Sequence, residues 1–195
     1  MRILVVFSHP APESFIGSLF HSACAALSER GHTLDIADLY ADGFDPVLRE
    51  DEFRAYASGR VCDDIARYVD QLRRAEGMLA IYPTWWYSMP AMMKGYFDRV
   101  WVPGAAFEIV DGKTAGLVAN IRRLLVITTY GSSQTLIENE VGSLAEAYWM
   151  RGMRRLMAPD CISRWCAQFG LDTIDPAGLE QFRARALREL GLFDN

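Results

Sequence analysis

Four aromatic residues, Tyr82, Trp85, Trp86 and Tyr87, crowd one short turn near the middle of the chain. A protein core normally takes its rings from strands and helix faces, so rings gathered in a turn suit stacking against a flat heteroaromatic ligand. The alternative interpretation is a hydrophobic plug or an interface between copies of the chain. The turn is therefore a candidate ligand site.

Two further loops carry polar groups that suit such a ligand. The loop "SHPAPESF" (8–15) places Ser8, His9 and Ser14 before a helical pattern, where free N–H groups and the positive end of the helix dipole favour a phosphate. Ser14 is equally suited to capping that helix. The loop "TTYGSSQT" (128–135) offers hydroxyl groups to a polar ring edge. No glycine precedes Gly17, so the glycine-rich fingerprint of the ordinary NAD-binding fold is missing.

The elements around these loops alternate between strand and helix patterns. Strands are expected at 3–7, 33–40, 77–82, 124–129 and 171–174, and helices at 15–30, 63–76, 90–101, 143–169 (broken near Pro159) and 176–190. Asp175 is the expected N-cap of the last helix, and Gly95 inside the third suggests close backbone packing. This alternation predicts an α/β fold with a doubly wound parallel sheet, whose ligands bind at the carboxyl ends of the strands.

Composition limits the possible partners. The 195 residues, with 51% hydrophobic residues and a formal net charge of −5, predict one domain over 1–195 and neither nucleic acid nor an anionic membrane as a partner. The uncharged run at 77–93 is too short to insert in a membrane, and the chain starts directly with a strand, so a cytoplasmic location is expected. The cysteines include no Cys-x-x-Cys pair and every histidine precedes Thr33, so no metal site is expected.

Three stretches carry a family resemblance. "SHPAPESF", "YPTWWYSMPAMMKGYFDRVWVPGAAFE" and "ITTYGS", in this order and spacing, resemble the flavodoxin-like NAD(P)H:quinone oxidoreductase family. That family includes DT-diaphorase, the modulator of drug activity B and the ancillary flavoproteins of potassium-efflux systems. The resemblance implies a flavodoxin-like five-stranded parallel sheet of order 2-1-3-4-5 with helices on both faces.

The resemblance also implies a cofactor site, position by position. The residues expected around the flavin phosphates are His9, Ser14, Phe15, Ile16 and Ser18. Those expected to border the isoalloxazine ring are Pro83, Thr84, Trp85, Trp86 and Tyr87, with Thr128, Thr129, Tyr130 and Gly131 on its remaining edge. Family members are typically homodimers, so the substrate pocket is expected to combine Trp86 and Tyr87 with Phe107 and Ile109 of a partner subunit.

The activity implied is that of an NAD(P)H dehydrogenase (quinone). Two electrons would pass as hydride from NADH or NADPH through bound FAD, or less favoured FMN, to a quinone or similar acceptor, by a ping-pong mechanism. The alternatives are a flavin-binding ancillary subunit of a potassium-efflux transporter and a one-electron carrier like flavodoxin. Four arginines are candidates for meeting the 2′-phosphate of NADPH, although such pairs are usually solvated: Arg122, Arg123, Arg154 and Arg155.

The sequence departs from the family pattern in three ways. Ile16 stands where the family often has Asn, and "TTYG" replaces "TTGG", which brings Tyr130 to the flavin edge. In the family a Tyr and a His after the third loop are proposed to stabilise the reduced flavin, but here the His has no counterpart, because no histidine follows His32. Tyr130 is the candidate catalytic residue in their place. Glu138 and Glu140 would repel an anionic flavin unless protonated, and we favour backbone N–H groups and the helix N-terminus at Pro90 for this task.

Overall fold

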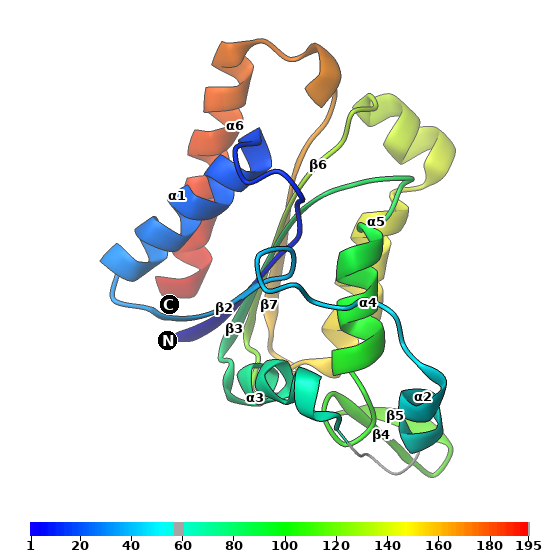
Figure 1. Cartoon of the computed structure of the whole chain (residues 1–195). Coiled ribbons are helices and arrows are strands. Elements are labelled where there is room, and N and C mark those ends of the chain that lie inside the picture. Colours follow the sequence, from blue (N-terminus) through cyan, green and yellow to red (C-terminus); the bar gives the residue numbers. More distant parts are fainter. Residues whose placement is uncertain (57–60, 195) are drawn as a thin grey trace.

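The computed structural model of the chain describes residues 1–56 and 61–194. At its centre lies a five-stranded sheet in which every pairing is parallel, with helices on both faces (Figure 1). The strands, in spatial order, are β2 (Thr33–Asp38), β1 (Arg2–Phe7), β3 (Gly77–Pro83), β6 (Arg123–Thr129) and β7 (Ile162–Gln168). The predicted flavodoxin-like order, 2-1-3-4-5, is confirmed.

Two helical layers enclose the sheet. α1 (Phe15–Glu29) and α6 (Pro176–Glu189) cover one face, and α3 (Ala66–Arg74), α4 (Ala91–Val100) and α5 (Leu144–Ala147) lie on the other (Figure 1). Alternate residues of β1 enter the two cores: Ile3 and Val5 pack on the α1 side, and Leu4 and Val6 on the α4 side. The continuous apolar run of this strand is therefore explained by burial on both faces.

The fifth strand differs from the prediction. The region 143–169, predicted as helix, instead contains α5 and then β7, and the strand predicted at 171–174 is wrong because Leu171–Thr173 forms the 3-10 turn η5. β7 is an edge strand, and only Cys166 and Ala167 of it are buried. Polar residues on its exposed part dilute the apolar pattern, so its pairing with β6, a tertiary contact, decides its conformation.

The remaining elements are short. The chain between β6 and β7 also contains the π-helical turns η2 (Leu136–Val141) and η3 (Tyr148–Gly152) and the 3-10 turn η4 (Met153–Leu156). Elements that the sequence did not predict are α2 (Glu50–Tyr56) and the antiparallel hairpin of β4 (Phe107–Val110) and β5 (Lys113–Gly116). The 3-10 turns η1 (Asp63–Ile65) and η6 (Leu190–Asp194) precede α3 and follow α6.

Two predicted local features are confirmed. Asp175 caps α6 by accepting a hydrogen bond from the N–H of Gly178 at 2.7 Å. A side chain at Gly95 would collide with Pro46, so the glycine lets the segment after β2 cross α4 at close range. Among the helices in residues 1–56 and 61–194, none is long and apolar enough to span a membrane.

Candidate functional site

A cavity of about 450 Å³ opens at the carboxyl ends of β3 and β6. It is lined by Pro83, Thr84, Trp85, Trp86, Thr129, Gly131, Ser132, Leu171 and Asp172. The two loops are joined beneath it, because the N–H of Thr84 donates to the carbonyl oxygen of Thr129 at 2.8 Å. Six of the residues predicted to contact a cofactor, from the second and third loops, therefore line one cavity.

The aromatic turn is a tight reversal of the backbone. The N–H groups of Trp85 and Ser88 each donate to the other residue's carbonyl oxygen, at 2.9 and 3.1 Å. Trp86 and Tyr87 between them have φ values of 49° and 63°, in the left-handed region that favours glycine and asparagine. Each such residue costs about 1 kcal/mol or more. Trp86 is 93% exposed, so it does not plug the core, and its ring is available to a ligand or to a partner.

The first loop is held by its own hydrogen bonds. The Ser14 hydroxyl donates to the carbonyl oxygen of Ala11 at 2.7 Å and accepts from the N–H of Gly17 at 3.2 Å, which makes Ser14 the N-cap of α1. His9 Nδ1 accepts from the N–H of Ala11 at 3.0 Å. The rings of His9 and Trp85 lie 6.0 Å apart, so the first loop reaches the aromatic turn.

The start of α1 meets an arginine that the sequence did not single out. Arg183 of α6 donates to the Ser18 hydroxyl at 2.8 Å, and its guanidinium lies 5.1 Å from the centre of the Phe15 ring. Ile16 is 3% exposed, so only its backbone is available to a ligand. Arg183 is one of several arginines in the last helix, and only the packing of α6 on α1 distinguishes it.

Tyr130 is buried rather than presented to the cavity. It is 4% exposed, and its ring stacks on Phe169 with centroids 4.9 Å apart and an interplanar angle of 15°. Burial raises the pKa of Tyr130, the hydrogen bond to Thr84 opposes that shift, and the charge of Glu146 adds to it. Tyr130 therefore keeps its phenolic proton at neutral pH.

Thr84 and Thr128 add a buried pair of hydroxyls at the base of the cavity. Their oxygens lie 2.8 Å apart, with Thr84 9% exposed and Thr128 fully buried. Thr128 was predicted to border one edge of the isoalloxazine ring. It does not line the cavity itself, and it contacts the cavity only through Thr84.

Asp172 brings a negative charge to the same cavity. A Cβ atom at Gly131 would lie 2.5 Å from a carboxylate oxygen of Asp172, so the small size of Gly131 leaves room for this carboxylate beside the third loop. The N–H of Leu171 donates to the carbonyl oxygen of Tyr130 at 2.9 Å and fixes this approach. Asp172 could not be predicted from the sequence, because its position depends on the turn that follows β7.

The other predicted substrate residues lie apart from the cavity within one chain. Phe107 and Ile109 are on β4, beyond the C-terminal end of α4, whereas the aromatic turn precedes the N-terminal end of that helix (Figure 1). Ten helical residues separate the two regions by about 15 Å. Ile109 is 62% exposed.

The arginines considered for a 2′-phosphate lie at the opposite edge of the sheet. Arg123 begins β6, whose carboxyl end forms the cavity. Arg122 directly precedes the strand and pairs with Asp160 at 3.1 Å. Arg154 donates to the carbonyl oxygens of Pro159 and Cys161 next to the start of β7. Within one chain, Arg122, Arg123 and Arg154 therefore lie away from the cavity.

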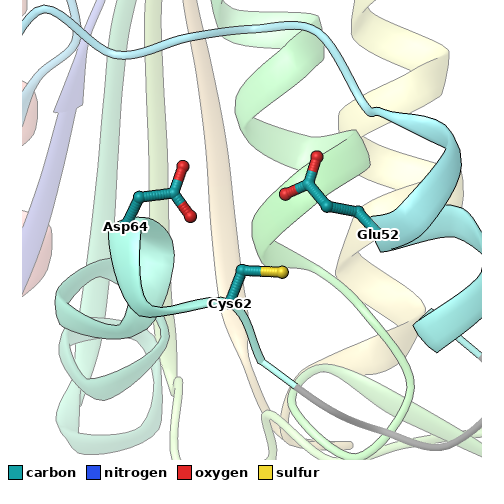
Figure 2. Close-up of side chains that lie close together, drawn as sticks. All are labelled: Glu52, Cys62 and Asp64. Atoms are coloured by element: carbon teal, nitrogen blue, oxygen red, sulfur yellow. The ribbon is translucent and has the colours of Figure 1, made fainter.

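A second cluster, on α2 and the turn before α3, has ligand types that suit a metal. Glu52, Cys62 and Asp64 point toward one another, with one ligand atom of each within 4.8 Å of the others (Figure 2). However, the guanidinium of Arg99, 4% exposed, holds both carboxylates, at 2.5 Å from Glu52 and 2.6 Å from Asp64. A cation would have to displace this buried charge, so the cluster is an ion-pair network that ties α2 and η1 to α4.

An open parallel sheet of this order, with its cavity at the carboxyl ends of the middle strands, defines a flavodoxin-like α/β protein. The family described as having a flavodoxin-like fold matches residues 1–158, and the chain belongs to that family. A human relative, ribosyldihydronicotinamide dehydrogenase [quinone], is 31% identical over 150 residues, which cover 68% of this chain and 65% of the relative. The chain thus spans slightly less than two thirds of that relative's length.

Two solved structures resemble the whole chain. The NAD(P)H:quinone oxidoreductase of Methanothermobacter marburgensis is 26% identical, with a TM-score of 0.83 and 97% of each chain covered. Smu.1420 of Streptococcus mutans UA159 is 25% identical, with a TM-score of 0.85 and coverage of 97% of this chain and 98% of its own. The resemblance to flavodoxin-like NAD(P)H:quinone oxidoreductases is confirmed by these matches.

Proposed function

We propose that the protein is a flavin-dependent oxidoreductase that passes two electrons from NADH or NADPH to a quinone or similar acceptor. The observation that carries this proposal is the single cavity formed by the aromatic turn and the third loop at the carboxyl edge of the sheet. The names of the human and Methanothermobacter relatives support the same reaction.

The residues present are compatible with a flavin. A volume of about 450 Å³ lies within the range of small-molecule sites, and Trp85 and Trp86 supply ring surface on one wall. The Ser8 hydroxyl, at the carboxyl end of β1, is fully buried and has no hydrogen-bond partner within the described residues. Buried polar groups normally have a partner, which a bound ligand or a water molecule would supply here.

A bound flavin would supply two-electron chemistry that no side chain offers. The chain's own residues would orient it. The turn uses the N–H groups of Trp85 and Ser88 internally, so those of Trp86 and Tyr87 remain for the polar ring edge. α4 begins with Pro90 as N-cap and no side-chain cap, so its first N–H groups and its positive dipole end are open to negative charge.

The phosphate end of the cofactor would lie at the start of α1. Ser14, the backbone of Phe15 and Ile16, and Ser18 form the first turn there. Arg183 adds a positive charge beside Ser18, where Ile16 replaces the polar Asn side chain that is frequent in the family. We favour FAD over FMN at this site, as the family resemblance implies.

We further propose that the working unit is a homodimer. Phe107 and Ile109, on β4, lie apart from the cavity of their own chain (Figure 1). The exposed rings of Trp86 and Tyr87 offer a face that a second copy can cover. Each subunit's hairpin of β4 and β5 would then complete the substrate pocket of its partner.

An anaerobic titration tests the proposed function. Flavin-loaded protein is titrated with NADPH and then NADH while the flavin absorption is followed, and a quinone is added last. Bleaching in one two-electron step and rapid recovery on adding the quinone would support the oxidoreductase and identify its donor. Slow bleaching despite tight flavin binding would favour an ancillary subunit or a one-electron carrier, and no flavin binding would contradict the proposal.

A further inference from the structure

The turn that follows β7 holds a carboxylate at the cavity. Two backbone hydrogen bonds tie this turn to the third loop. The N–H of Gly170 donates to the carbonyl oxygen of Ser132 at 2.8 Å. The N–H of Leu171 donates to the carbonyl oxygen of Tyr130 at 2.9 Å. Asp172, the next residue, therefore extends from a backbone that is anchored to the third loop on both sides of the β7 turn.

The carboxylate of Asp172 lies against the third loop. One of its oxygens lies 2.5 Å from the position that a Cβ atom of Gly131 would take, and both residues line the cavity. The side chain of Asp172 is exposed, so a molecule that enters the cavity from solvent meets its charge.

The charge of Asp172 is not balanced by the rest of the cavity. The other described residues that line it are neutral: Pro83, Thr84, Trp85, Trp86, Thr129, Gly131, Ser132 and Leu171. Within residues 1–56 and 61–194, no lysine, arginine or histidine forms an ion pair with Asp172. Arg185 lines the neighbouring cavity with Gly170, and its guanidinium donates to the carbonyl oxygen of Ala167. The described lining therefore contains one negative charge and no positive charge.

An anion that enters this cavity is repelled by Asp172. The repulsion between two like charges falls with distance and, at a site open to solvent, with the salt concentration. A neutral quinone experiences no such repulsion, and a cationic acceptor is attracted. The dihydronicotinamide ring of the electron donor is also uncharged.

We propose that Asp172 makes the protein select neutral or cationic electron acceptors and discriminate against anionic ones such as quinone sulfonates. This inference rests on the proposed function and narrows the substrate class of the same site. Asp172 is a specificity-determining residue, because its carboxylate acts on the charge of the acceptor and takes no part in the transfer of electrons.

The test compares two acceptors that differ in charge but little in shape, a naphthoquinone sulfonate and the corresponding neutral sulfonamide. The value of kcat/KM is measured for each acceptor with flavin-loaded protein and NAD(P)H. Asp172→Asn removes the charge and keeps the shape of the side chain. We expect it to raise the ratio of kcat/KM for the sulfonate to that for the sulfonamide about threefold to tenfold. The ratio cancels any effect that the variant has on both acceptors through the flavin.

A second readout needs no electron transfer. Calorimetry gives the dissociation constants of an anthraquinone sulfonate and its sulfonamide with oxidised flavin-loaded protein and no NAD(P)H. Asp172→Asn should strengthen sulfonate binding relative to sulfonamide binding by a similar factor. Added salt should strengthen sulfonate binding to the wild-type protein, because it screens the repulsion, and this salt dependence should be smaller in Asp172→Asn.

Two further variants separate a local charge from a general one. Asp172→Glu keeps the charge and should keep the wild-type ratio. Asp160→Asn is the matched control, because it removes the same charge from an exposed carboxylate that pairs with Arg122 near the start of β7, at the opposite end of the strands. Its ratio should not change.

Each outcome decides. An unchanged ratio in Asp172→Asn, with flavin bound and quinone reduced, would overturn this inference and leave the proposed function standing. An equal rise in Asp172→Asn and Asp160→Asn would also overturn it, because it would indicate the net charge of the whole protein. A wild-type protein that binds no flavin, or that reduces neither quinone, would overturn the proposed function and this inference with it.

Discussion

Trp86 combines an exposed ring with an unfavourable backbone conformation. Its side chain is 93% exposed and its φ is 49°, so neither burial nor local backbone preference explains a tryptophan at this position. A residue that folding does not need is best explained by what it binds.

Replacing Trp86 separates binding from stability. Trp86→Ala removes a ring that contributes little to the core, so we expect the free energy of unfolding to change by less than about 0.5 kcal/mol. Turnover with NAD(P)H and a quinone should fall at least about fivefold, as expected for the loss of a stacking surface worth about 1 kcal/mol or more. Steady-state kinetics and urea unfolding of the same preparation check this, and equal losses in both would favour a structural role.

Ser14 is expected to act on both stability and cofactor retention. Ser14→Ala removes the N-cap of α1 and should cost about 1 kcal/mol of unfolding free energy. It should also weaken flavin binding, measured by equilibrium dialysis, because the first loop loses its anchor to Ala11. Asp175→Ala is the matched control, since it removes the cap of α6. A similar loss of flavin in that control would show that cap removal acts through stability alone.

The sequence predicted those site residues that lie at the end of a predicted strand or in the loop directly after it. Trp85, Trp86 and Thr129 come directly from loops that a strand pattern precedes, so their place in the cavity follows from the topology. Asp172 and Arg183 depend on how the turn after β7 and the helix α6 pack, and one sequence carries no signal for such contacts.

At the scale of elements, the apolar sequence patterns predicted strands correctly where the strands are almost completely buried. β1, β3 and β6 are buried almost throughout and were predicted within about two residues at each end. The prediction missed β7 because β7 is an edge strand with partly exposed residues. It missed the hairpin of β4 and β5 because three of the four β4 residues are exposed. Half-buried strands depend on their neighbours more than on their own residues.

The crossing of α4 by the segment after β2 gives a direct test of packing. Gly95→Ala places a methyl group against Pro46, so we expect a loss of about 1 to 3 kcal/mol despite the better helix propensity of alanine. Gly152→Ala is the matched control: Gly152 has a φ of −77° and open space around its Cβ position, so its change should be neutral or slightly stabilising. Urea unfolding measures the free energy of unfolding of both variants. Equal values for the two variants would contradict the close crossing of α4 by this segment.

At the scale of the whole molecule, an ion-pair cluster that stabilises the fold and the candidate site lie at opposite ends of the strands. Asp35 of β2 accepts from Arg74 at 2.8 Å and from Arg2 at 3.3 Å, and so joins the start of β1 to α3. Burial opposes its ionisation, but the hydrogen bonds from Arg74 and Arg2 outweigh burial and lower the pKa of Asp35.

The sign of the pH dependence follows from that lowered pKa. The ionised carboxylate stabilises the native state above its unfolded-state pKa, near 3.9, and this contribution is lost as the pH falls through the lower native value. Asp35→Asn should therefore reduce the free energy of unfolding at pH 7 and narrow the difference from wild type toward pH 3. Urea unfolding at several pH values measures this, while flavin affinity should not change because the cavity is at the other edge. A difference from wild type that grows as the pH falls would contradict this role of Asp35.

The packing of α1 against α6 has a consequence for synthesis of the chain on the ribosome. α1 forms early, yet its buried face is completed by α6, and Arg183 reaches Ser18 only when nearly the whole chain has emerged. Until then, apolar residues such as Leu19, Phe20 and Leu27 lack part of their cover. Nascent chains that stop before Pro176 should therefore be the species that chaperones hold and proteases cleave.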